Sequence, residues 1–144
     1  MNRTGFRSAA LAVAAAATFA TGCAGAPQRT VSRPPLQLPA ADRFHPGGCH
    51  DAADAVLAVG RFTYDHAGAN RLTDADRAVL AEQSGRLVAV RDRADPLLAD
   101  QFGALLQAIG FVRLRTGRTY DPHLLRDVES ARVQVQNSCT QARP

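Results

Sequence analysis

The chain contains no lysine and no tryptophan, and it has only one methionine, two tyrosines and three cysteines. Without tryptophan, a core must be built largely from alanine, valine and leucine, and a small domain of this kind is marginal unless something else stabilises it. The formal net charge is +4, but from Cys49 onward 12 arginines stand against 12 acidic residues, which leaves this part neutral (12 − 12 = 0). Nucleic-acid-binding domains concentrate positive charge on their folded face. We therefore expect no nucleic-acid partner.

The motifs that carry catalysis are also missing. Ser84, Ser130 and Ser138 fall within predicted helices, and none stands in a G-x-S-x-G turn. No glycine-rich phosphate loop is present. Cys49-His50 places a thiol beside a base, but a disulfide at Cys49 would remove the thiolate that such chemistry needs. We expect no enzymatic activity and no cofactor.

The first 22 residues have the layout of an export signal. Arg3 and Arg7 precede an apolar run, residues 9–20, which only Thr18 interrupts, and small residues follow. A bilayer-spanning helix needs about 20 apolar residues. The run of 12 is therefore too short, and we expect cleavage after it rather than a spanning helix.

Two cleavage sites compete. Cleavage after Ala24-Gly25-Ala26 would place Pro27, with its missing N–H and fixed φ, directly after the scissile bond. The other site, Ala20-Thr21-Gly22-Cys23, resembles the lipobox of bacterial lipoproteins, although Ala20 stands where that family usually has leucine. The resemblance implies that Cys23 is acylated, for example with palmitate, and becomes the new N-terminus. The mature protein would then be lipid-anchored at the extracytoplasmic face of the cell membrane.

Residues 23–48 have the composition of a linker. Five of the eight prolines lie here, and the segment shows little apolar periodicity. Such a sequence buries too little surface to offset its ordering entropy. We expect a disordered tether between Cys23 and a folded domain at residues 49–144.

From Cys49 the apolar spacing becomes helical, and it predicts four amphipathic helices. Thr73 and Asp95 are suitable N-caps for the second and third helices, and Asp121 for the fourth. Gly60 and the loop at residues 66–70 end the first helix, and Gly117 ends the third. The predicted inward residues are Ala52, Val56, Val59 and Thr63; Leu80, Gln83, Leu87, Val90 and Ala94; Leu98, Phe102, Leu105, Ile109, Val112 and Thr116; and Leu125, Val128, Ala131, Val135 and Cys139.

The cysteines distinguish four helices from three. An exported chain meets an oxidising compartment, and assignment of Cys23 to lipid leaves Cys49 and Cys139. These residues lie at the same end of an up-down-up-down bundle, whereas a second helix continuing into the third, kinked at Pro96, would separate them by about 20–30 Å. We predict an all-α, antiparallel four-helix bundle stapled by a Cys49–Cys139 disulfide.

One end of this bundle gathers polar residues. The stretches 60–66 and 117–123 resemble each other, and both fall at helix ends opposite the disulfide. His66, His123, Asp65 and Asp121 form a weak candidate set for a divalent metal, together with Tyr64 and Tyr120. The spacing fixes no two ligands on one helical face. End packing and capping therefore account for these residues more simply, and we assign no metal.

Two classes of function remain. The first is a membrane-tethered, non-catalytic helical module that binds an envelope protein or polymer. The second is a carrier of a small molecule or metal, with its ligand in a cavity or at the His/Asp/Tyr end. An exposed apolar patch that includes Phe111 and Leu114 would favour the first class, and a ligand-sized cavity would favour the second.

Overall fold

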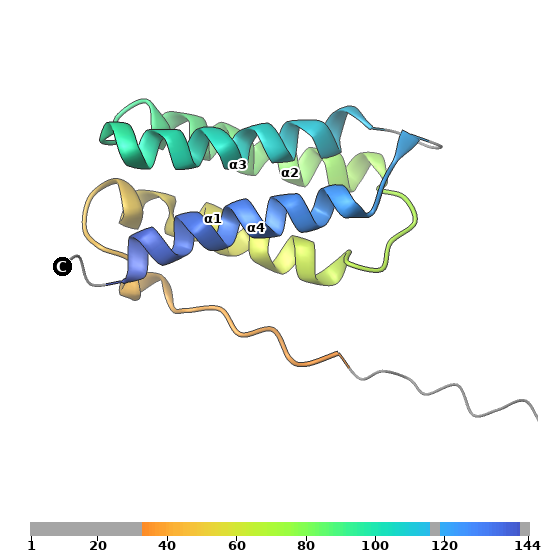
Figure 1. The fold of residues 1–144 in the computed structure, drawn as a ribbon, viewed down its shortest axis with the longest axis horizontal. Coiled ribbons are helices and arrows are strands. Elements are labelled where there is room, and N and C mark those ends of the chain that lie inside the picture. Colours follow the sequence, from red (N-terminus) through yellow and green to blue (C-terminus); the bar gives the residue numbers. More distant parts are fainter. Residues whose placement is uncertain (1–32, 116–118, 142–144) are drawn as a thin grey trace, which may run out of the picture. The chain divides into compact units, whose positions relative to one another are not determined.

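The computed structural model describes residues 33–115 and 119–141. Its helices are α1 (Gly48–Asp65), α2 (Asp74–Arg91), α3 (Pro96–Leu114) and α4 (His123–Thr140), preceded by the short 3₁₀ turn η1 (Ala41–Arg43). Each helix packs against the next, and α4 returns to α1 (Figure 1). The predicted all-α four-helix bundle is confirmed, and no strand occurs in the described ranges.

The helix starts follow local rules, with one exception. Thr73 caps α2 in a full capping box with Asp76, and the Asp95 carboxylate caps α3 by accepting from the Leu98 N–H at 3.1 Å. By contrast, α4 begins one residue later than a cap at Asp121 implies, although this carboxylate still accepts from the His123 N–H at 2.8 Å. Gly60 lies inside α1 and does not end it.

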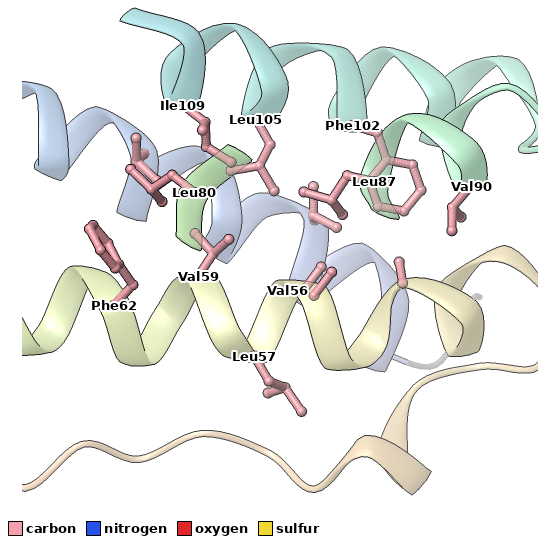
Figure 2. Packing of buried hydrophobic residues seen from close by; sticks show 14 of the residues in the cluster. Val56, Leu57, Val59, Phe62, Leu80, Leu87, Val90, Phe102, Leu105 and Ile109 are labelled. Carbon is pink, nitrogen blue, oxygen red and sulfur yellow. The ribbon is translucent and has the colours of Figure 1, made fainter. Parts of the chain in front are cut away.

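The core is a set of apolar side chains that the four helices direct inward (Figure 2). Leu80, Leu87, Phe102, Leu105 and Ile109 are among the largest fully buried residues, and α1 and α4 contribute mainly alanine and valine. The predicted inward positions are buried, except that Ala94 and Ala131 are only half-buried. Thr116 and Gly117 lie outside the described residues.

The disulfide joins the start of α1 to the end of α4. Cys49 and Cys139 are both buried, and their Cα atoms are 5.2 Å apart. The bond links residues 90 positions apart in the sequence. Because it closes such a long loop, the entropic model assigns it a stabilisation of about 4–5 kcal/mol.

The segment before α1 differs from the expected disordered linker. We call residues 34–45 the N-terminal strap. Phe44 is buried, and the backbone N–H of His45 donates to the Cys139 carbonyl at 2.9 Å. At the other end, the Tyr64 hydroxyl donates to the Pro34 carbonyl at 2.8 Å. Burial of the apolar side chains of Phe44 and Leu38 favours an ordered segment despite its proline-rich composition.

The strap covers a second face of α1. Ala53, Leu57 and Gly60 are buried at helical spacing, and Figure 2 shows Leu57 pointing away from the bundle interior toward the strap. A Cβ added at Gly60 would lie 3.0 Å from the Leu38 side chain. The strap then turns into α1 at Gly47, whose φ of 87° favours glycine. The compact unit therefore begins at Pro34 rather than at Cys49.

Candidate functional site

The end of the bundle opposite the disulfide carries the polar residues singled out from the sequence. Here α1 ends, α2 begins, α3 ends and α4 begins. The residues do converge on one end, as the topology predicts. Each side chain, however, has its own local role.

His66 belongs to a hydrogen-bonded chain that ties α1 to α2. Its Nδ1 lies 2.9 Å from the Phe62 carbonyl, and its Nε2 lies 3.0 Å from Oδ1 of Asp76. Both partners are acceptors, so only the doubly protonated ring can donate to both. The ring also stacks on Phe62, with centroids 4.2 Å apart.

Asp76 is held by several donors at once. Its Oδ2 accepts from the backbone N–H of Thr73 at 2.8 Å and from the Thr73 hydroxyl at 2.7 Å. These hydrogen bonds lower the pKa of the Asp76 carboxyl below its ordinary value of 3.8, and the nearby His66 adds to the shift. The carboxylate is therefore a fixed structural anion rather than a proton donor.

Tyr120 is a second buried aromatic residue at this end, after Phe62. Burial raises the pKa of its phenol, and the carboxylates of Asp121 and Asp76 raise it further. The hydroxyl has no hydrogen-bond partner among the described residues. The Tyr120 side chain is therefore a neutral, buried phenol, which is consistent with a packing role at this end of the bundle.

The four metal candidates are not assembled into a site. Asp65 is exposed at the end of α1, and Nε2 of His123 accepts from the Arg126 guanidinium at 3.0 Å. The Asp121 carboxylate accepts a hydrogen bond from the first backbone N–H of α4, and His66 forms a hydrogen bond with Asp76. Across the described ranges, no group of three or more His, Cys, Asp or Glu residues is arranged to hold a metal ion.

The Cys49-His50 pair offers no nucleophile, because Cys49 is held in the disulfide. The hydroxyl of Ser84 donates to the Leu80 carbonyl of its own helix at 2.8 Å. Gln83 is buried as predicted, but its Oε1 has no hydrogen-bond partner in the described part of the chain. None of these arrangements positions a reacting group.

Among the described residues, the buried charged side chain is that of Arg132, which the sequence-based assignment missed. Its side chain is only 4% exposed. The guanidinium forms a two-pronged pair with Glu129, with Nη2 to Oε1 at 2.6 Å and Nε to Oε2 at 2.9 Å, and it also donates to Gln136. Glu129 in turn accepts from the Thr63 hydroxyl at 2.6 Å, which links α4 to α1.

The position of Arg132 depends on Gly60 and on the strap. An added Cβ at Gly60 would lie 3.1 Å from Cδ and 3.2 Å from Nε of Arg132. The Arg132 side chain therefore packs against the α1 backbone at Gly60, in space that any larger residue at position 60 would occupy. Leu38 packs against the same position. The signal available in the sequence was the glycine in mid-helix, which usually marks a close approach.

On the other side of the bundle, α2 and α3 border an open groove of about 540 Å³. It is lined by Asp74, Arg77, Ala78, Ala81, Gly110, Arg113 and Leu114. α3 also exposes three large apolar side chains, of which Leu114 lines the groove: Leu97 is 72% exposed, Phe111 47% and Leu114 81%. α3 is also the one described helix that is long and apolar enough, by length and composition, to cross a membrane. Within the bundle it packs against α2 and α4.

Comparison with known proteins finds no match: no family model, curated protein or solved structure is significantly similar to this chain.

We predict that Glu129→Gln lowers the free energy of unfolding by about 1–3 kcal/mol, because it leaves the buried Arg132 charge without its carboxylate. Glu129 itself is 39% exposed, so water compensates part of the loss. The control is Glu82→Gln, whose pair with Arg86 is exposed and should contribute less than about 0.5 kcal/mol. Urea unfolding measures both variants, and equal losses would contradict a structural role for Arg132.

We predict that Asp76→Asn destabilises the protein by about 1 kcal/mol at pH 7, because the capping box is weakened. The pKa of Asp76 is lower in the folded than in the unfolded state, so its contribution is present above about pH 3.8 and is lost as pH falls below that value. The difference in the free energy of unfolding between wild type and variant should therefore become smaller below pH 3.8. Asp127→Asn, at an exposed position in α4, should show no such narrowing. A gap that does not change with pH would refute the assignment.

Proposed function

We propose that this chain is an exported, lipid-anchored, non-catalytic helical module that binds a macromolecular partner at the cell envelope. The observation that carries the binding role is the apolar outer face of α3, with Leu97, Phe111 and Leu114 exposed. Large apolar side chains exposed on one face of a helix are typical of interaction sites. It is also the feature that favours a binding module over a carrier.

The anchor depends on Cys23, which lies outside the described residues. Eleven residue steps (34 − 23 = 11) separate it from Pro34, where the compact unit begins. Such a length reaches at most about 40 Å. Because Pro34 is bonded to Tyr64 near the end of α1, an anchor at Cys23 would hold the bundle by the end opposite the disulfide. This proposed orientation is opposite to the one that a linker running to residue 48 would imply, in which the disulfide end faces the membrane.

The carrier hypothesis has one supporting observation, the groove between α2 and α3. Its volume of about 540 Å³ falls within the range of small-molecule sites. The groove is open to solvent, however, and is continuous with the exposed α3 face through Gly110 and Leu114. We therefore assign it to the binding surface of a macromolecule.

For the anchor, we predict that the mature protein begins at Cys23, carries acyl chains and fractionates with membranes, because two or more acyl chains hold a protein durably in a bilayer. Cys23→Ser should abolish both the added mass and the membrane retention. Ala20→Leu, which restores the usual lipobox residue, should keep both. Intact-mass spectrometry and cell fractionation measure these outcomes. A mature protein that starts at Pro27 without acyl mass would refute the anchor.

For the binding role, we predict that a photoreactive amino acid at position 111 captures a defined partner on intact cells, because this side chain lies on the exposed α3 face. The matched control is position 79, where Val79 is exposed to a similar extent on α2. Mass spectrometry of the adducts identifies the partner. If positions 111 and 79 give the same background, the α3 face is not a binding surface.

A further inference from the structure

α3 has an inward apolar face that the bundle covers, and an exposed outer face that carries Leu97, Phe111 and Leu114. The inward residues Leu98, Phe102, Leu105, Ile109 and Val112 are buried. A second stripe runs along the opposite side with alternating spacings of three and four residues, the pattern of a helix–helix seam. We call it the outer seam, and all its members are exposed: Leu97, Asp100, Ala104, Gln107, Phe111 and Leu114.

We propose that the outer seam pairs with the outer seam of a second copy of this chain, with the two α3 helices antiparallel about a two-fold axis. This inference deepens the proposed binding function by naming the partner. In that arrangement Leu97 faces Leu114 of the other copy, and Ala104 faces Gln107. In an antiparallel pair the residue numbers of facing positions have a constant sum, here 211 (97 + 114 = 104 + 107 = 211). Each seam position therefore faces another seam position. A two-fold interface requires this kind of self-complementary patch.

The charges on this face favour the antiparallel arrangement. Asp100 would lie opposite Phe111 of the partner copy, one turn from the Arg115 of that copy. Neither Asp100 nor Arg115 has an ion pair among the described residues, and both are exposed. A parallel pair would instead set Asp100 beside Asp100 and Arg115 beside Arg115. The antiparallel pair forms two opposite-charge contacts, and the parallel pair forms two repulsive ones.

The backbone beside the seam leaves room for close approach. Gly103 and Gly110 lie within α3, yet a Cβ at either position would meet no atom within 4 Å. Glycine inside a helix costs about 1 kcal/mol relative to alanine, and nothing in the monomer requires it at these positions. Small residues of this kind let two helices approach closely.

The strap argues for a protein partner over the bilayer. It covers the outer face of α1, on the side of the bundle away from α3 (Figure 1). The chain that leads to Cys23 leaves this strap at Pro34, so the tether is attached on the side remote from the outer seam. A short tether therefore does not direct the outer seam to the membrane, but it does concentrate copies of the chain in one plane.

Cysteine crosslinking in cells that express the full chain tests both the pairing and its direction. The double variant Leu97→Cys, Leu114→Cys is treated with a bismaleimide of about 8 Å, a length that spans facing positions on packed helices. A covalent dimer is expected from the double variant, and little from either single variant. Within one α3 the two positions are about 25 Å apart and do not crosslink. Self-crosslinking by the Leu97→Cys variant alone would show a parallel pair and overturn the proposed direction.

Interface variants separate pairing from crowding at the membrane. Phe111→Asp, in the double-cysteine background, should reduce the crosslinked fraction at least about tenfold, because it removes the largest apolar side chain of the outer seam and sets a second carboxylate opposite Asp100 of the other copy. Val79→Asp, an equally exposed apolar site on α2, should leave it unchanged. Circular dichroism confirms that both variants stay folded. Equal loss in the two variants, or no dimer at all, would overturn the proposal.

Two further outcomes identify a different occupant of the seam. Sedimentation of the Cys23→Ser chain with anionic lipid vesicles, lost in Phe111→Asp, would assign the outer seam to the bilayer and overturn the dimer. Capture of another protein at position 111, with no self-adduct, would also overturn the dimer. In that last case the proposed binding function would stand, so failure of the two ideas is distinguishable.

Discussion

The disulfide between Cys49 and Cys139 is the constraint on which the rest of the bundle depends. It fixes the first turn of α1 against the last turn of α4, so α1 and α4 must lie side by side and run in opposite directions. The chain between them can satisfy this only with an even number of helices. The bond also compensates for a core that contains no tryptophan and much alanine and valine, since small side chains bury little apolar area per residue. The same end anchors the strap through the hydrogen bond between His45 and Cys139.

The helices α1 and α3 both have an outward face with few charges, but only that of α1 is covered. Each has an inward stripe that fills the core and a second, outward stripe with few charges. The second stripe of α1 is covered by the strap, through Leu38 and Phe44. The second stripe of α3 is covered by nothing in the described chain. The asymmetry distinguishes two sides of the bundle: the strap covers the outer face of α1, and α3 exposes Leu97, Phe111 and Leu114.

Arg132 shows how a charge is accommodated within so small a core. The guanidinium is desolvated, and such burial is tolerated only when its donors are satisfied with good geometry. Glu129 and Gln136 receive those donors, and Thr63 holds Glu129 from the neighbouring helix. The absence of a side chain at Gly60 provides the space. This network is specific to the contact between α1 and α4 and thus reinforces the pairing that the disulfide imposes.

Local signals in the sequence determined the helix number, the caps at Thr73 and Asp95, the inward stripe of each helix and the pairing of the cysteines. These features depend on residues a few positions apart, or on the parity of the helices, so no tertiary information was needed. The strap and the burial of Arg132 depend on contacts between residues far apart in the sequence, such as Pro34 with Tyr64 and Thr63 with Glu129, which periodicity does not encode. The separate roles of His66 and His123 depend on which nearby side chain each ring meets, which the helical pattern does not specify either. Proline content suggested disorder for residues 23–48, because composition does not show that Phe44 is buried and that Leu38 packs against the core. The tertiary structure alone decided which apolar stripes are covered, because coverage depends on what packs outside each helix rather than on the helix itself.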